Sequence, residues 1–299
     1  MKIEGVVTAL VTPFDQNGRV DEKALRNLCR FQLKESVNGV FLLGTTGEGL
    51  LQSKEERKFV TKVAIEELKG KIPVLIHVGG TDIDEVFELA RYAVDSGVDA
   101  ITSITPYFFK LSEREIIEFY VELSHNVPFD YPIYIYNFPD ASGNDVTPEA
   151  IETILNKTKN VVGLKFSSAD MVRMQEYIKL KKYGFNVLSG CDQLFYPLLS
   201  IGCDGLVSGN ANILPNLYLS IFNNFKKGDQ ESAKQLNYYG SEVAKLFKYG
   251  NIPNIKAGMK LIGLDGGYVK KPFKNLTLNE LEILQREFTK IYNELKEVV

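Results

Sequence analysis

The sequence has few of the residues from which metal centres, disulfide frameworks and charge-relay triads are built. Its three cysteines, Cys29, Cys191 and Cys203, are odd in number and form no Cys-x-x-Cys pair. Neither a disulfide framework nor a zinc site is therefore expected, and the thiols are predicted to be free and buried. Only two histidines are present, and His125 falls in a predicted helix. A Ser–His–Asp triad or a three-histidine metal centre is thus hard to assemble.

Charge and hydrophobicity also argue against two classes of partner. The net charge is −3 and no basic run is present, so nothing favours binding to nucleic acid or to an anionic membrane. No apolar stretch approaches the roughly 20 residues that span a bilayer. The amino-terminal segment lacks the pattern of an export signal. We expect a cytoplasmic protein that acts on a small molecule.

Short apolar, β-branched runs alternate along the chain with helical patterns. The runs cover residues 5–12, 39–44, 73–79, 100–105, 133–137, 161–166, 186–190 and 205–208. Apolar residues at three- and four-residue steps predict helices between them, for example over 21–35, 54–68, 83–96 and 112–124. Ser53 and Ser112 each precede a glutamate by three residues, which predicts two capping boxes.

Eight buried strands alternating with helices predict an α/β fold, a closed (β/α)8 TIM barrel. An open doubly wound sheet is the alternative, but no Gly-x-Gly-x-x-Gly pattern follows the first strand. Helical patterns over 214–227, 230–249, 254–262 and 278–298 follow the last strand. We therefore predict a barrel over residues 1–225 and a C-terminal extension of three helices over 226–299.

Lys165 interrupts the apolar run 160–166, where a buried strand should carry no charge. A desolvated lysine amine gives up its proton more readily and becomes a nucleophile towards a carbonyl carbon, so Lys165 is a candidate for Schiff-base formation. The alternative is a structural lysine held by an ion pair at the end of a strand.

Catalytic groups of such barrels collect where the strands end. After the second predicted strand, the glycine-rich loop 44–49 can direct backbone N–H groups and two hydroxyls at a carboxylate or an oxyanion. It lacks the lysine of a phosphate-binding loop, although it could also be a structural turn. Tyr136 ends the strand before that of Lys165 and is a candidate proton shuttle, with a core tyrosine as the alternative. His77 could line the barrel mouth or lie in the core.

Three motifs, GTTGE at 44–48, YNFP at 136–139 and GLK at 163–165, closely resemble the pyruvate-dependent class I lyase family. That family includes dihydrodipicolinate synthase, N-acetylneuraminate lyase and 2-keto-3-deoxygluconate aldolase. The resemblance implies that Lys165 forms an imine with pyruvate and that Tyr136 relays protons. It also implies that Thr45 and Thr46 bind the carboxylate, with Thr46 counted among the catalytic residues. No other cofactor is needed, because the protonated imine is itself the electron sink.

The remaining strand-end positions are expected to line the substrate site, together with the second residue after the YNFP motif. The predicted substrate-binding residues are Thr45, Thr46, Gly47, Tyr107, Ala141, Gly190, Asp192, Gln193, Val207 and Ser208.

Departures from the family's motifs bear on the substrate. Synthases usually carry an arginine where this chain has Ala141, and the second aromatic of their TPYY motif is Phe108 here, without a hydroxyl. The Asp-Glu pair of N-acetylneuraminate lyase is Asp192-Gln193. Residues 163–170, 76–79 and 271–273 resemble the sugar-acid lyases.

We therefore expect reversible cleavage of a 2-keto-3-deoxy sugar acid, such as 2-keto-3-deoxygluconate, to pyruvate and glyceraldehyde. The alternatives are N-acetylneuraminate lyase, 4-hydroxy-tetrahydrodipicolinate synthase and a non-catalytic pyruvate-binding relative. The resemblance also implies a homotetramer built from dimers, in which the aromatic run 107–109 could form an interface.

Overall fold

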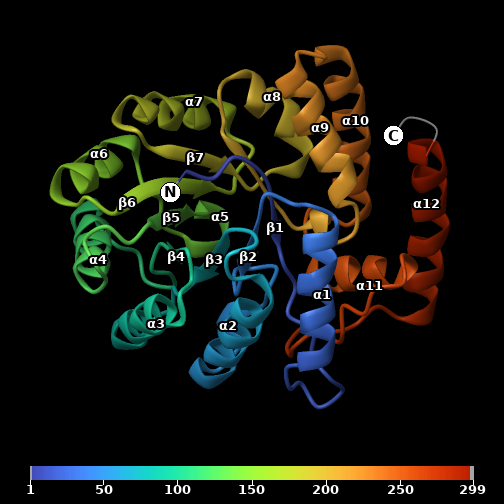
Figure 1. Cartoon of the computed structure of the whole chain (residues 1–299), viewed down its shortest axis with the longest axis horizontal. Helices are drawn as coiled ribbons and strands as arrows, with labels where there is room; N and C mark the ends of the chain where they lie inside the picture. Colours follow the sequence, from blue (N-terminus) through green and yellow to red (C-terminus); the bar gives the residue numbers. More distant parts are fainter. Residues whose placement is uncertain (1, 297–299) are drawn as a thin grey trace.

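The computed structural model describes residues 2–296, and its centre is a closed barrel of eight parallel strands (Figure 1). Each strand pairs with the next along the chain, and β8 returns to pair with β1. The strands are β1 (Gly5–Ala9), β2 (Gly39–Leu42), β3 (Val74–His77), β4 (Ala100–Ile104), β5 (Ile133–Asn137), β6 (Val161–Phe166), β7 (Asn186–Ser189) and β8 (Gly205–Ser208). The predicted (β/α)8 fold is confirmed.

Helices alternate with these strands and surround the barrel (Figure 1). They are α1 (Glu22–Lys34), α2 (Lys54–Leu68), α3 (Ile83–Ser96), α4 (Glu113–His125), α5 (Pro139–Ser142), α6 (Pro148–Lys157), α7 (Met171–Lys179), α8 (Phe195–Ser200) and α9 (Pro215–Lys227). Both predicted capping boxes are present, at Ser53 with Glu56 and at Ser112 with Glu115. The short helix α5 was not predicted, and it carries Ala141.

Three further helices follow the barrel: α10 (Gln230–Leu246), α11 (Ile252–Leu261) and α12 (Leu278–Lys296). Helix α10 ends three residues before the predicted end at 249, because Lys248 and Tyr249 adopt left-handed backbone conformations. The Asn251 side chain caps α11 by accepting from the Asn254 N–H, so this helix begins before the predicted residue 254. The predicted helix end at 298 lies outside the described residues. The division into domains at 225/226 stays a prediction, and it falls within the last turn of α9.

Parallel strands covered by helices are buried on both faces, and the core accordingly has two parts. Between strands and helices lies a large apolar layer, and a smaller cluster fills the barrel itself. The inner cluster contains Phe41, Tyr134, Tyr136, Leu188 and Val207. Aromatic side chains thus surround the inner face of β6, where Lys165 lies.

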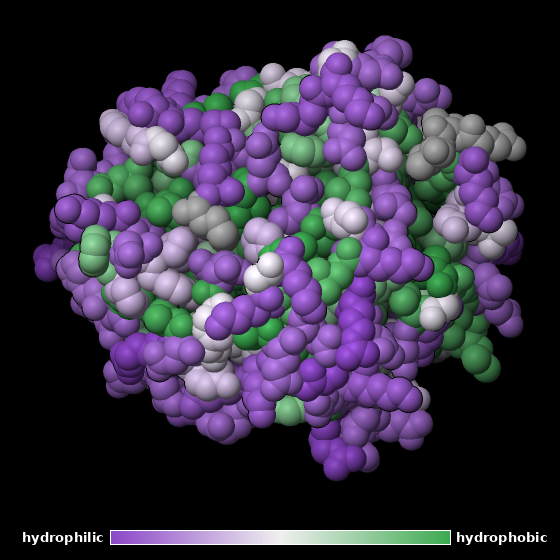
Figure 2. Space-filling model, viewed as in Figure 1, coloured by the Kyte–Doolittle hydropathy of each residue, from purple (hydrophilic) through white to green (hydrophobic). Residues whose placement is uncertain are grey.

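Hydrophilic side chains cover most of the face shown in Figure 2, and hydrophobic ones gather chiefly in the hollows between helices. Among residues 2–296, no helix has the length and apolar character needed to cross a membrane.

Candidate active site

Lys165 lies on β6 between Tyr136 on β5 and Leu188 on β7, in register with both. Its residue is only 6% exposed, and its ammonium group lies 4.0 Å from the centre of the Tyr136 ring and 4.5 Å from that of Phe41. No carboxylate of the described chain forms an ion pair with it, so the structural alternative to a nucleophilic lysine finds no support. Aromatic faces, rather than an acid, surround the amine.

The Tyr136 hydroxyl lies 3.1 Å from the Thr45 hydroxyl of the loop after β2. Thr45 is exposed whereas Tyr136 is buried, so this contact joins the barrel interior to the solvent-facing mouth. Three predicted residues, Lys165, Tyr136 and Thr45, are thereby brought together. A phenol and a threonine hydroxyl in contact can pass a proton between them.

The remainder of the glycine-rich loop is held by hydrogen bonds from residues outside it. The Gly47 carbonyl accepts hydrogen bonds from the Thr12 hydroxyl and the Gln52 amide, both at 2.8 Å. Thr46 faces the end of β8, where a Cβ on Gly209 would lie 3.4 Å from its hydroxyl oxygen. The loop therefore bridges the ends of β1 and β8.

Gly190 follows β7 and lies directly against the lysine. A Cβ at this position would lie 2.1 Å from the Ser167 hydroxyl oxygen and 3.2 Å from Lys165 Cε. Any side chain here would displace one of these two groups. A glycine at residue 190 thus leaves room for the lysine side chain.

Asp192 lies two residues after Gly190 and is buried. Its Oδ2 accepts from the Asn210 amide at 2.8 Å, whereas its buried Oδ1 has no hydrogen-bond partner among the described residues. Burial raises the pKa of Asp192 from 3.8 to about 6, against the opposing effects of Ser208, Asn210 and the Lys165 charge. The site therefore contains a buried acid that is within the electrostatic influence of the lysine.

His77 is buried beneath these groups and accepts a hydrogen bond from the Ile104 N–H at Nε2, 3.1 Å away. Its ring meets the Tyr136 ring edge to face, with centroids 5.9 Å apart. Burial, with the charges of Arg57 and Lys165, holds the pKa of His77 well below its ordinary range. His77 is thus a neutral core residue.

The other predicted residues are less closely gathered. Tyr107 is half-buried and packs against the inner cluster, in which Val207 is fully enclosed. Ala141 is exposed on α5. Gln193 is half-buried, and its carbonyl accepts from Asn237 of α10. Among residues 2–296, no side-chain hydrogen bond joins Gln193 to Asp192.

Sequence reasoning missed several groups near these residues. Asn210 is given no role in the sequence analysis, although it lies only two residues after the end of β8. Lys110, from the segment before α4, donates to the Gly143 carbonyl at the end of α5, at 2.7 Å. Glu48 and Lys256 form a buried ion pair behind the loop. No local pattern reveals such partners, but the charge of Glu48 within a glycine-rich loop was a usable signal.

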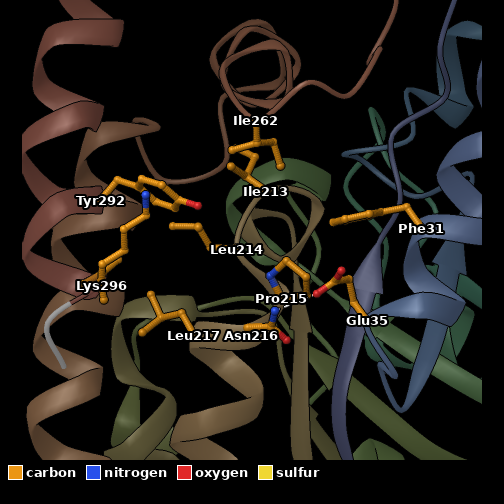
Figure 3. A pocket seen from close by; sticks show the side chains of 11 residues that line it. Phe31, Glu35, Ile213, Leu214, Pro215, Asn216, Leu217, Ile262, Tyr292 and Lys296 are labelled. Atoms are coloured by element: carbon orange, nitrogen blue, oxygen red, sulfur yellow. Dashed lines mark hydrogen bonds between the residues drawn. The ribbon is translucent and has the colours of Figure 1, made fainter. Parts of the chain in front are cut away.

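A cavity of about 440 Å³ lies elsewhere, among α1, α9, α11 and α12 (Figure 3). Apolar side chains dominate its lining, and Figure 3 shows Phe31 and Glu35 facing Tyr292 and Lys296 across it. None of the predicted site residues lines it. Barrel enzymes carry their chemistry at the carboxyl ends of the strands, so we place the active site there.

A (β/α)8 barrel with a buried lysine between aromatic rings at its mouth has the features of a Schiff-base lyase. Residues 2–291 match the model of the dihydrodipicolinate synthetase family. A 4-hydroxy-tetrahydrodipicolinate synthase from Methanopyrus kandleri is 33% identical over 292 residues, covering 97% of each chain.

Solved structures agree. The wild-type sialic acid aldolase of Ruminococcus gnavus superposes with a TM-score of 0.94 at 28% identity over 100% of both chains. YagE, a prophage protein of the dihydrodipicolinic acid synthase family from E. coli K12 solved with pyruvate, gives 0.92 at 27% identity, covering 97% of this chain and 98% of its own.

This chain therefore belongs to the dihydrodipicolinate synthetase family. Enzymes of this family are lyases that form a Schiff base between a lysine and pyruvate, with no added cofactor. The predicted family and the predicted class of enzyme are confirmed. The curated relatives carry the name of the synthase rather than that of a sugar-acid aldolase, so the substrate is treated below as a proposal.

Proposed function

We propose that this enzyme reversibly cleaves a 2-keto-3-deoxy sugar acid, with 2-keto-3-deoxygluconate as the first candidate, to pyruvate and an aldehyde such as glyceraldehyde. The supporting observation is the polar group of Asp192, Ser208 and Asn210, which offers hydrogen-bond acceptors and donors of the kind that bind sugar hydroxyls. Ala141, where the synthases usually have an arginine, contributes no charge to bind a second carboxylate.

In this proposal the Lys165 amine attacks C2 of the keto acid, and loss of water gives the imine. The loop hydroxyls and backbone of Thr45 and Thr46 bind the C1 carboxylate. Tyr136 returns a proton to the departing C2 oxygen and then accepts the proton of the C4 hydroxyl. The C3–C4 electron pair moves into the imine, the aldehyde leaves, and C3 is protonated before water releases pyruvate.

The test measures pyruvate release from 2-keto-3-deoxygluconate and, in parallel, from N-acetylneuraminate. Borohydride trapping of pyruvate on the same enzyme locates the imine by peptide mass. We expect release from the sugar acid, an adduct on Lys165, and loss of both in Lys165→Ala with the fold retained. An adduct on another lysine would refute the mechanism. Release from N-acetylneuraminate alone would refute the proposed substrate. It would mean that Gln193 can replace the glutamate of the Asp-Glu pair in N-acetylneuraminate lyase.

Synthase activity is the second candidate, and Lys110 is the observation that favours it. This lysine is exposed and binds the Gly143 carbonyl, so a cation reaches α5 from outside the YNFP motif. Neither neighbour of Ala141 in the sequence, Asp140 or Ser142, carries a positive charge. The curated relatives also bear the synthase name.

Substitution of Lys110 separates the two candidates. If Lys110 binds the second substrate's carboxylate, Lys110→Met should raise the KM for that substrate by about 10-fold or more, as expected for a lost charge-assisted hydrogen bond. The measurement is formation of 4-hydroxy-tetrahydrodipicolinate from pyruvate and aspartate 4-semialdehyde, the amino aldehyde acid that supplies the other four carbons and the nitrogen. Lack of product with the wild-type enzyme would exclude the synthase.

A further inference from the structure

Behind the glycine-rich loop lies an ion pair that the proposed chemistry does not use. Lys256 of α11 and Glu48 of the loop are fully enclosed, with side chains 2% and 0% exposed, and Nζ lies 2.5 Å from Oε1. Burial lowers the pKa of Lys256 to about 8, although Glu48 opposes this change. Two formal charges are thus enclosed a short distance behind the proposed carboxylate-binding threonines.

The pair joins four segments that are distant in the sequence. The Lys256 ammonium group also donates to the carbonyls of Thr12 and Tyr268, each at 2.7 Å. The second carboxylate oxygen of Glu48 accepts from the Lys270 N–H at 2.7 Å. One cation and one anion therefore hold together the segment after β1, the loop after β2, helix α11 and the chain before α12.

The connection continues to the residues that we propose bind the substrate. Glu48 has a left-handed backbone, with φ of 53°, which is uncommon for a residue other than glycine, asparagine or aspartate. The Thr12 backbone binds Lys256 while its hydroxyl binds the Gly47 carbonyl. Ile255, next to Lys256, approaches Gly209 beside Thr46. A displacement of the pair would thus move the backbone of Thr45 and Thr46.

Folding stability alone gives little reason for such a pair. Removing two charges from water costs several kcal/mol per ion, and well-packed apolar residues often serve as well or better. A buried pair does, however, fix the relative position of the groups that carry the charges. Because Glu48 lies within the binding loop, we explain the ion pair by this geometric effect rather than by folding stability.

We propose that Glu48 and Lys256 are positioning residues for pyruvate: they fix the backbone of the 44–49 loop so that Thr45 and Thr46 meet the substrate carboxylate. The proposal rests on the proposed imine chemistry of Lys165. Neither residue touches the reacting atoms, so the affinity for pyruvate depends on the pair while the chemistry at Lys165 does not.

The experiment titrates pyruvate against borohydride-trapped adduct in the wild type, Glu48→Gln, Lys256→Met and the double variant, with Tm measured for each. For Glu48→Gln we expect a half-saturating pyruvate concentration raised by about 10-fold or more, since small misplacements of binding groups are costly. The trapped fraction at saturation should stay that of the wild type. The double variant should bind about as weakly as the worse single variant, because the pair acts as a unit.

Lys181→Met is the matched control. It removes a lysine that pairs with the buried Asp204 at 2.7 Å, next to the start of β8 and away from the loop. Its half-saturation should equal that of the wild type. A merely destabilised protein loses adduct at saturation, whereas a displaced loop shifts the midpoint.

Two results would overturn the proposal: a wild-type midpoint in folded Glu48→Gln, or the same shift in the Lys181→Met control. If Glu48→Gln does not fold, Glu48→Asp replaces it, since it keeps both charges but shortens the link by one methylene. A raised midpoint there supports the proposal and an unchanged one refutes it. Absence of any adduct in the wild type would instead refute the imine chemistry itself, and the proposal with it.

Discussion

The polar groups around Lys165 differ in whether they are free to exchange a proton with the substrate. His77 is kept neutral, and its Nε2 already accepts from the Ile104 N–H, so this nitrogen is not free to take a substrate proton. Tyr136 has its hydroxyl beside that of Thr45 at the mouth. We therefore propose that proton transfer is performed by Tyr136 rather than by His77.

Tyr136→Phe tests this assignment. We expect the variant to form the pyruvate adduct on Lys165 but to turn over the sugar acid about 10²–10⁴-fold more slowly, the usual span for a lost acid–base group. Steady-state kinetics and borohydride trapping measure the two effects separately.

Tyr134→Phe is the control for that experiment, since it removes another buried hydroxyl from the same strand. Tyr134 lies two residues before Tyr136, and its hydroxyl donates a hydrogen bond to the Asn186 side chain at 2.8 Å. Turnover in Tyr134→Phe should remain within a few-fold of the wild type. Equal losses in the two variants would assign the Tyr136 effect to packing and remove it from the mechanism.

Asp192 gives a prediction for the pH dependence of stability. Because its pKa rises from 3.8 to about 6 on folding, the folded protein holds a proton between these values that the unfolded chain has lost. The contribution of Asp192 to the stability of the wild type therefore falls as pH rises through this window. Asp192→Asn lacks this titration, so its stability relative to the wild type should increase by roughly 2–3 kcal/mol between pH 4 and pH 7.

Denaturant unfolding of both proteins at several pH values makes the measurement. The exposed Asp140→Asn, on α5, serves as the control and should show no such change relative to the wild type. A stability difference between Asp192→Asn and the wild type that is independent of pH would show that Asp192 has an ordinary pKa in the folded protein.

At the scale of elements, sequence patterns located the strands well because each is a short continuous apolar run. The end of β1 was predicted three residues too late, and Leu10 and Val11 are buried although they lie beyond the strand. Burial continues into the loop, so hydrophobicity does not mark the end of hydrogen bonding. The capping boxes, by contrast, depend on contacts three residues apart and were predicted at both sites.

The candidate site likewise contains some residues that the sequence predicts and others that it does not. Lys165, Tyr136 and Thr45 follow from strand-end position and from family motifs, since parallel strands bring their carboxyl ends to one place. Lys256 and Thr12 are in contact although they lie 244 residues apart in the sequence, and Lys110 and Gly143 lie 33 residues apart. Neither has a periodic or local signature. Such partners become visible only when the loops are placed in space.

The two capping boxes allow a matched comparison of elements. Glu56 closes the box of α2 and also pairs with Lys270 at 2.5 Å, whereas Glu115 closes that of α4. Glu115→Ala should lower Tm only slightly, because it removes just the exposed capping-box contact. Glu56→Ala should cost roughly 1 kcal/mol more, because it also frees the Lys270 segment. Thermal unfolding measures both, and equal shifts in Tm would mean that the Lys270 contact adds nothing.

At the scale of the whole molecule, the segment after β4 exposes two aromatic rings. Phe108 is 85% and Phe109 is 71% exposed, and their rings meet edge to face with centroids 5.0 Å apart. Phe108 has φ of 78°, a left-handed conformation that is rare for an aromatic residue. Exposed aromatic rings on a strained segment suit a contact between subunits better than they suit solvent.

We propose that this segment forms part of the interface of the predicted homotetramer. Burying one phenylalanine side chain contributes roughly 1.5–3 kcal/mol, so the double change Phe108→Ser, Phe109→Ser should move the protein towards smaller species at micromolar concentration. Phe129→Ser is the control, since Phe129 is 75% exposed on the segment between α4 and β5. Sedimentation velocity should show a smaller species for the double variant alone, with Tm falling as subunits separate. An unchanged sedimentation coefficient in the double variant would place the interface elsewhere. Dissociation caused by Phe129→Ser would place the interface at the other end of α4.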